Sequence, residues 1–294
     1  MKRIIKYLFM GLYKMIRGKN KKTSISYQKI KNEPHIFIYS VYGRTSSTAL
    51  QRFINSSNEI CIFGEPESMG INNLFLNAIH KLEKDMDRDQ YRKKLEELEL
   101  LKNCYRKNKH KLFYPNAIND LSETVEKLKD LYCNAYKPPI PVKRIGFKEI
   151  TVPNENDITR LHEFFPKSHI LFIFRDPVEQ FRSVNKCKYF PYSNDVNHFL
   201  KEYERISNIY LQHNTKHNNQ NFIENIRLYS INDLDKLFKH IEISGFDETL
   251  IGKKVNSTSD HELSDEILET IETSKAKENY LRMKIISKNF FTSL

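Results

Sequence analysis

Cysteine is scarce in this chain, and no pair of cysteines has the spacing of a metal or redox motif. The 294 residues contain four cysteines, Cys61, Cys104, Cys133 and Cys187, with no C-x-x-C pair among them. This scatter argues against a structural zinc site and indicates a reducing compartment. We expect Cys61 and Cys187 to be core thiols, because each lies inside or just after a predicted strand or helix.

Long apolar runs are also missing. No stretch of about 18 apolar residues occurs, so we expect no membrane-spanning helix. The N-terminal segment has no acidic residue before Glu33, and its apolar residues fall at helical spacing among basic ones. It lacks the small-residue cleavage site of a secretory signal. Two interpretations stay open: residues 1–22 attach to an anionic membrane surface, or they form a terminal helix packed on its own domain.

The charge balance is basic, with 48 Lys and Arg against 37 Asp and Glu and a net charge of +11. Such a balance favours an anionic partner, whether a nucleotide, an acidic glycan, a nucleic acid or an anionic lipid. A Lys-rich solvated surface explains the same numbers equally well. Hydrophobic residues make up 39% of the chain, which suffices for one large α/β domain with insertions.

Strand-like and helix-like segments alternate from residue 34 onward. Apolar, β-rich runs predict strands at residues 35–41, 59–63, 144–150, 169–174 and 222–229. We expect helices at residues 45–57, 157–165, from Asp176-Pro177 onward, and at 195–214, 230–241 and 263–283, the last capped by Ser264. This alternation predicts a three-layer α/β fold with a central parallel sheet and ligands at the carboxyl ends of its strands.

We divide the chain into a basic N-terminal segment and linker, residues 1–33, and an α/β domain, residues 34–294. Residues 71–136 have the pattern of charge-laced helices. We expect them to form a helical insertion beside the sheet and to shape an acceptor pocket.

A polar loop follows the first predicted strand, with the sequence Gly43-Arg44-Thr45-Ser46-Ser47-Thr48. It lacks the G-x-x-x-x-G-K-[ST] pattern of nucleoside triphosphatases. One cation, four consecutive hydroxyls and the backbone N–H groups can still hold a phosphate without magnesium. The alternative is an ordinary strand–turn–helix with a Ser/Thr cap.

A second turn follows the strand at residues 169–174, with Arg175-Asp176-Pro177 and then Ser183 eight residues after Arg175. Asp-Pro is a common helix start, and Arg175 could simply pair with a carboxylate. Ser183 lies about two turns into the helix, so it meets Arg175 only if the chain arches back. Because both turns end strands of one sheet, they predict a ligand with two separate phosphate groups.

Together the two motifs resemble the sulfotransferases that use 3′-phosphoadenosine 5′-phosphosulfate (PAPS), in particular bacterial-type carbohydrate or glycolipid sulfotransferases. The resemblance implies a P-loop-like fold, PAPS as donor, 3′-phosphoadenosine 5′-phosphate (PAP) as product, and no metal. It makes Gly43–Thr48 the phosphosulfate loop, with Ser46 where the family usually has Gly. It assigns Arg175 and Ser183 to the 3′-phosphate and Tyr229 to the adenine end. The late Arg-Lys-Gly segment of cytosolic members has no clear match.

Sulfuryl transfer also needs a base for the acceptor. Several carbohydrate and protein-tyrosine members of that family place Gly-Glu after the second strand, and here Gly64-Glu65 stands there. We therefore expect Glu65 to be the base and Arg44 to stabilise the leaving phosphate; alternatively Glu65 is a loop carboxylate paired with Arg44. Glu67 and Lys148 are candidates for acceptor binding, although Lys148 is equally explained as a solvated lysine. His35, His80, His162 and His169 stand isolated in the sequence and are expected to be structural.

The sequence thus predicts a sulfotransferase that acts on a hydroxyl of a glycan or glycolipid. It has no Walker-B acid or cluster of metal ligands, so we expect no metal. We expect a cytoplasmic enzyme, with residues 1–22 as a candidate attachment to the inner face of the membrane. The competing interpretations are a P-loop-like kinase or NTPase and a basic protein that binds nucleic acid or a membrane surface. No motif with base-stacking aromatics or zinc spacing supports nucleic-acid binding.

Overall fold

The computed structural model describes ten ranges of the chain: residues 34–64, 126–127, 129–130, 132–133, 138–139, 141–150, 155–187, 193–217, 221–253 and 262–294. The N-terminal segment, residues 1–33, and most of the expected insertion lie outside the described residues, as do Glu65 and Glu67. Within the described ranges, no helix is long and apolar enough to cross a membrane.

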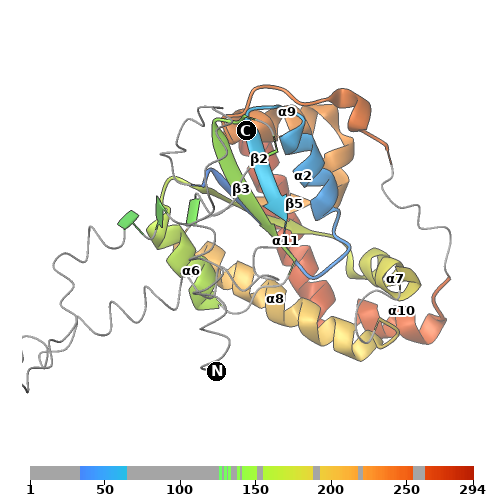
Figure 1. The fold of residues 1–294 in the computed structure, drawn as a ribbon. Helices are drawn as coiled ribbons and strands as arrows, with labels where there is room; N and C mark the ends of the chain where they lie inside the picture. The colour runs from blue at the N-terminus through green and yellow to red at the C-terminus, as the bar shows by residue number, and fades with distance from the viewer. Residues whose placement is uncertain are drawn as a thin grey trace, which may run out of the picture.

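Five parallel strands form one sheet in the order β2-β3-β1-β4-β5 (Figure 1). They are β1 Ile36–Ser40, β2 Ile60–Gly64, β3 Arg144–Glu149, β4 His169–Phe174 and β5 Phe222–Glu224. All residues of β1 and nearly all of β4 are buried. Strands buried on both faces read as continuous apolar runs, which is how this sequence signals a parallel sheet.

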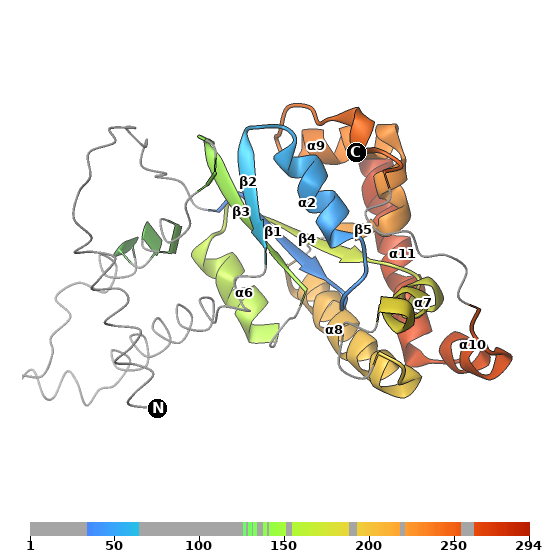
Figure 2. The ribbon, with the colours of Figure 1, turned by 45° about the vertical axis from the view of Figure 1, so that its right-hand side comes forward.

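Helices cover both faces of the sheet (Figure 2). One face carries α6 (Glu155–Phe164) and α8 (Val196–His217), and the other carries α2 (Ser47–Asn55) and α9 (Ile231–His240). The helix α11 (Lys275–Ser293) runs beside β5, while α10 (Asp265–Glu272) packs against α7 (Pro177–Cys187). Two short 3₁₀ helices, η2 (Asn225–Tyr229) and η3 (Glu248–Leu250), flank α9.

Two hydrophobic cores result from the period-two alternation of the strands. Along β1, Phe37 and Tyr39 enter the core beneath α6 and α8, whereas Ile36 and Ile38 enter the core beneath α2 and α9. Part of the expected insertion reaches the first core. Tyr132 packs its ring 5.1 Å from Phe147 and 5.6 Å from Phe165, measured between ring centroids.

These observations confirm the predicted α/β fold with a central parallel sheet and helices on both faces. Three details of the prediction are wrong. The fifth strand ends at Glu224, because Asn225–Tyr229 form a 3₁₀ helix. The single helix expected at 263–283 is two, because Ser274 breaks it and caps α11 by accepting from the N–H of Lys277. Cys61 is buried as expected, but Cys187 at the end of α7 is exposed.

Candidate active site

The loop after β1 and the turn after β4 are neighbours because β1 and β4 are adjacent in the sheet. The paired residues run from Ile36 with His169 to Ser40 with Ile173. One step further, the N–H of Val41 donates to the carbonyl oxygen of Ile173 at 3.0 Å. Parallel strands end at the same edge, so both sequence motifs meet at the carboxyl edge of the sheet.

The loop between β1 and α2 has a costly backbone conformation. Tyr42, Arg44 and Ser46 have φ angles of 64°, 70° and 72°, and they alternate with Gly43 and Thr45, whose φ is not positive. Each left-handed L-residue costs roughly 1–2 kcal/mol. Turns built from such residues can direct successive N–H groups toward one concave face, an arrangement that binds anions.

The start of α2 is open to an anion rather than capped by its own side chain. Ser46 is the N-cap residue, yet its hydroxyl makes no capping hydrogen bond, and the first turn of α2 holds no acidic residue. The structure therefore shows no side-chain cap by Ser46 at the start of this helix. A helix N-terminus of this kind carries partial positive charge that favours a phosphate.

The four loop hydroxyls divide into different environments. Thr45 is fully buried, and its hydroxyl bonds to that of Ser40, which in turn donates to the carbonyl oxygen of Tyr42 at 2.6 Å. The Thr45 hydroxyl therefore holds the shape of the loop. Ser47 is buried at the start of α2, whereas Thr48 is exposed and Ser46 is half-buried.

The two motifs touch directly through Arg44 and Ser183. The Nε of Arg44 donates to the Oγ of Ser183 at 3.1 Å, and Ser183 is only 1% exposed. The helix α7 runs unbroken from Pro177 to Cys187, so the chain does not arch back toward Arg175. Among the described contacts, Ser183 thus joins Arg44 of the other motif, and Arg175 approaches the carbonyl oxygen of Arg44 at 3.5 Å.

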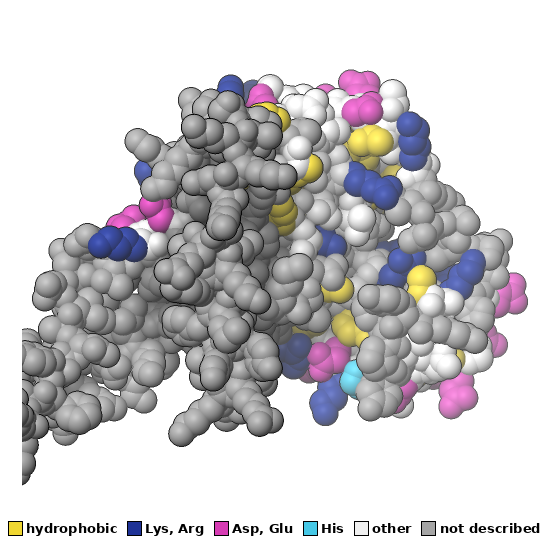
Figure 3. Space-filling view, in the orientation of Figure 1, with side chains coloured by type: hydrophobic (Ala, Val, Ile, Leu, Met, Phe, Trp, Pro, Cys, Tyr) yellow, Lys and Arg dark blue, Asp and Glu magenta, His cyan; other side chains and the backbone are white. Residues whose placement is uncertain are grey.

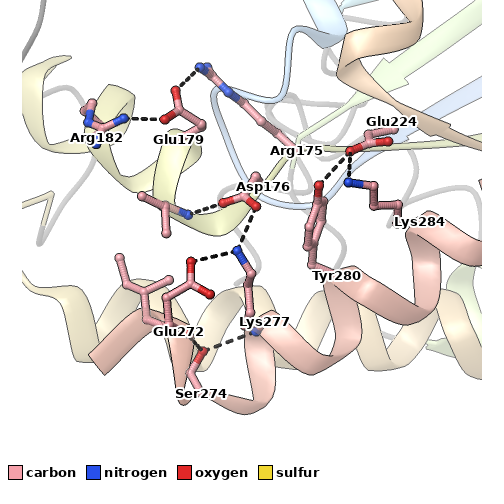
Figure 4. Close-up of polar contacts among 12 residues, drawn as sticks. Arg175, Asp176, Glu179, Arg182, Glu224, Glu272, Ser274, Lys277, Tyr280 and Lys284 are labelled. Carbon is pink, nitrogen blue, oxygen red and sulfur yellow. Dashed lines mark hydrogen bonds and ion pairs between the residues drawn. The ribbon is translucent and has the colours of Figure 1, made fainter. Parts of the chain in front are cut away.

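Arg175 also pairs with a carboxylate, which was the alternative interpretation of this residue. Its guanidinium lies 3.5 Å from Glu179, which also pairs with Arg182 (Figure 4). Burial lowers the pKa of Arg175 and Arg44 acts in the same direction, whereas Glu179 and Tyr229 raise it. This interaction places Tyr229 near Arg175, and the Tyr229 side chain is 54% exposed.

Three buried side chains on α7 and α8, which sequence analysis did not identify, donate hydrogen bonds to backbone carbonyls of the two turns. The Nε2 of Gln180 on α7 donates to the carbonyl oxygens of Val41 and Gly43, at 2.7 Å each. From α8, the hydroxyl of Tyr210 donates to the carbonyl oxygen of Ser40 and that of Tyr203 to the carbonyl oxygen of Arg175, both at 2.9 Å. The tyrosines are seven residues apart on one helical face, and a buried tyrosine hydroxyl needs such a partner.

The C-terminal helices hold the turn after β4. The Nζ of Lys277 lies 2.9 Å from Asp176 and 2.8 Å from Glu272, while Asp176 also accepts from the N–H of Val178 at 2.9 Å (Figure 4). Beside them Tyr280 donates to Glu224 at 2.6 Å, at the end of β5. The Arg175-Asp176-Pro177 turn is therefore fixed both by its own helix cap and by α11.

Lys148 lies inside the protein. It is 4% exposed on β3, paired in register with Gly64 of β2 and Ile38 of β1. The interpretation as a solvated lysine is therefore wrong. Gly64 ends β2 at the same edge of the sheet as the loop, which brings the chain to this edge just before Glu65.

Three of the histidines expected to be isolated, His35, His162 and His169, are gathered in two clusters, and His80 lies outside the described residues. The ring of His169 lies 5.2 Å from His35 and 5.4 Å from His240, at the amino edge of the sheet. The other cluster joins His162 to the nearby rings of two α8 histidines, His213 and His217. In the described part of the chain, no group of three or more His, Cys, Asp or Glu side chains could hold a metal ion.

The sheet, the anion-binding loop and the two arginines at its carboxyl edge are the features of a P-loop-like α/β fold. On the face drawn in Figure 3, basic side chains lie over α7, and others are scattered over the surface. Residues 34–226 match the sulfotransferase family, so the chain belongs to that family of enzymes, which transfer a sulfuryl group from a sulfonate donor to an acceptor. This confirms the family that the two motifs resemble. No curated protein matches the sequence.

Proposed function

We propose that this sulfotransferase uses PAPS as its donor and transfers the sulfuryl group to a hydroxyl of a glycan or glycolipid. The observation that carries the proposal is the contact between the two motifs, in which Arg44 donates to Ser183 at 3.1 Å. It joins the loop after β1 and the turn that carries the half-buried Arg175 at one edge of the sheet. A nucleotide with phosphates at both its 3′ and 5′ positions needs two such groups side by side.

The residues present fit that donor. The loop Gly43–Thr48 would hold the 5′-phosphosulfate through its N–H groups, the Arg44 guanidinium and the hydroxyls of Ser46, Ser47 and Thr48, with Thr45 as internal support. Arg175 and Ser183 would hold the 3′-phosphate, and Tyr229 would lie at the adenine end. Glu179 would release Arg175 when the 3′-phosphate binds, because the phosphate offers the guanidinium a stronger partner.

The transfer exchanges one S–O bond for another. The acceptor oxygen forms a bond to sulfur as the bond from sulfur to the bridging phosphate oxygen breaks, and PAP leaves. Glu65 would take the proton of the acceptor hydroxyl. Arg44 and the N-terminus of α2 would stabilise the negative charge that develops on the leaving phosphate.

The acceptor side is proposed from sequence. Lys148, buried beside Gly64 at the end of β3, and Glu67 would contact the acceptor, and residues 71–136 of the α/β domain would form the insertion that shapes its pocket. A glycan or glycolipid suits the basic charge of the chain. We place the enzyme in the cytoplasm, with residues 1–22 attached to the inner face of the membrane.

Calorimetric titration of the purified full-length chain with PAP, in the presence of a metal chelator, tests the donor assignment. We expect micromolar or tighter binding by the wild type. Arg175→Ala should weaken it about 30-fold, because the charge-assisted hydrogen bonds to the 3′-phosphate are lost. Arg205→Ala is the matched control, since Arg205 forms a comparable pair with Glu202, at 2.9 Å, on the surface of α8.

The outcome separates the competing functions. No binding of PAP by folded wild-type protein would reject the donor, and magnesium-dependent binding of ATP in its place would favour a kinase or NTPase. Equal losses in Arg175→Ala and Arg205→Ala would mean that the Arg175 turn is not the phosphate site.

A further inference from the structure

The anion-binding loop depends on support from outside itself. Tyr42, Arg44 and Ser46 all occupy the left-handed region that L-residues avoid. Such a conformation persists only when surrounding contacts hold it. The contacts that fix the loop carbonyls should therefore decide whether its N–H groups face an anion.

Gln180 holds two of these loop carbonyls at once. It is fully buried, and its single Nε2 donates to two loop carbonyl oxygens, those of Val41 and Gly43, at 2.7 Å each. The orientation of the amide is fixed, because the reverse orientation would set its own oxygen against two carbonyl oxygens. In the described part of the protein its Oε1 has no hydrogen-bond partner. An unpaired buried carbonyl is costly, so a leucine or methionine would suit this position better if packing were its only role.

Gln180 also has an informative place in the chain. It lies on α7 and, in the sequence, stands between Arg175 and Ser183, the two residues assigned to the 3′-phosphate. The loop is therefore bound at three points to α7 and the turn before it: by Arg175 of the turn to the carbonyl oxygen of Arg44, by Gln180 to those of Val41 and Gly43, and by Ser183 to the Arg44 side chain. Of these, the Gln180 bonds are the shortest and the most deeply buried.

We propose that Gln180 is a positioning residue that couples the two phosphate sites of the donor. Through its two bonds, any ordering of α7 by the 3′-phosphate is transmitted to the loop that receives the 5′-phosphosulfate. Gln180 itself touches neither phosphate. The inference rests on the proposed function for the identity of the ligand, but its hold on the loop can be measured without any ligand.

The test compares two buried amides with matched chemistry. Gln180→Met keeps the shape of the side chain and removes both donors. The control is Asn279→Leu on α11. Asn279 is also fully buried, also donates twice from one nitrogen, to Ser207 at 2.9 Å and Asn208 at 3.0 Å, and also has an oxygen without a hydrogen-bond partner in the described structure. The two variants should lose similar stability, and only the first should loosen the loop.

Hydrogen exchange of a peptide covering residues 41–48 gives the ligand-independent measurement. In Gln180→Met we expect exchange about tenfold faster than in the wild type, with no change in Asn279→Leu. In the wild type, adenosine 3′-phosphate should protect this peptide although it bears no 5′-phosphate. In Gln180→Met that protection should disappear.

Calorimetry then separates positioning from general destabilisation. Gln180→Met should weaken binding of PAP and of adenosine 5′-phosphate about tenfold, while the affinity for adenosine 3′-phosphate changes less than about twofold. If Gln180 had only a structural role, the substitution would weaken the binding of all three ligands by a similar factor. If Gln180→Met is not folded, Gln180→Asn gives the same comparison, because it keeps the amide but is one methylene too short to reach both carbonyls.

Each result has one meaning. Unchanged exchange of the loop in folded Gln180→Met overturns the proposal, and so does an equal loss for the 3′- and 5′-phosphate ligands. Faster exchange in a protein whose wild type binds no PAP would reject the donor while leaving the hold of Gln180 on the loop in place.

Discussion

The carboxyl and amino edges of the sheet differ in the ionisable side chains that gather there. At the carboxyl edge, a loop with three left-handed residues carries Arg44, and Arg175 approaches that loop from the neighbouring turn. At the amino edge, three histidines pack together, and burial lowers the pKa values of His35, His169 and His240. The carboxyl edge thus gathers two arginines and three left-handed residues within five positions, whereas the amino edge gathers three histidines with lowered pKa values beside Arg144 and Glu242. A concentration of strain and cations is typical of an edge that binds a ligand, whereas ionisable groups packed against one another are typical of an edge that holds the fold together.

The largest expected effect is the loss of stability in acid, which should arise at the amino edge. Burial, His35 and His240 lower the pKa of His169 to about 4, while Glu242 opposes them and Arg144 adds to the shift. The unfolded chain takes up this proton near pH 6.5, so the stabilisation is complete above that pH and is lost as the pH falls toward 4. We expect a loss of about 2 kcal/mol from this group, allowing for its partial exposure.

Urea unfolding at about pH 7.5 and about pH 5 measures this loss. The variant His169→Gln should be less stable at the higher pH but should show a shallower decline toward the lower one. An unchanged pH dependence in that variant would move the acid sensitivity to other groups and would break the contrast between the two edges.

The two turns at the carboxyl edge differ in how far their structure could be predicted from the sequence. The turn after β4 follows local rules, because Asp176 caps its own helix through the N–H of Val178 and Pro177 begins α7. The loop after β1 does not. Its conformation rests on Gln180 and Tyr210, which are more than a hundred residues away in the sequence. Residue types and spacing located both halves of the candidate site, but the bonds that shape the first half are tertiary.

The errors have the same origin. His35 and His169 are far apart in sequence, yet they meet because β1 and β4 pair in parallel register. The apolar pattern continues past Glu224, so the local sequence gives no signal for the change from strand to 3₁₀ helix. Whether Ser183 meets Arg175 could not be decided from the sequence; in the structure Ser183 contacts Arg44, because the loop after β1 lies next to α7 and the intervening helix is unbroken.

An intermediate effect should distinguish the two turns within the carboxyl edge. Tyr210→Phe removes the hydroxyl that supports Ser40 before the loop, and Tyr203→Phe removes the one that supports Arg175. Each change leaves a buried carbonyl oxygen short of a donor, so each should cost about 1–1.5 kcal/mol in unfolding free energy. Tyr210→Phe should weaken the binding of adenosine 5′-phosphate more than that of adenosine 3′-phosphate. Tyr203→Phe should weaken the binding of adenosine 3′-phosphate more.

Thermal melts and calorimetric titration of both single variants provide the readout. Since the two tyrosines lie on one face of α8 and lose the same group, each variant is the control for the other. The same ligand preference in both would mean that α8 supports the edge as a whole rather than each turn separately.

The smallest expected effect is a gain. Ser46 has φ 72° and ψ 19° and makes no capping hydrogen bond, so its side chain contributes strain without the usual benefit of an N-cap serine. Ser46→Gly should remove that strain, partly offset by the greater chain entropy of glycine in the unfolded state, for a net gain of about 0.5–1 kcal/mol. The matched control is Ser264→Gly, because Ser264 has φ −64° and caps α10 by accepting from the N–H of Ile267. That change should destabilise the protein by a few tenths of a kcal/mol. Urea unfolding of the two variants should therefore give opposite signs for the same substitution, and a loss at both positions would show that the Ser46 side chain stabilises the strained loop rather than burdening it.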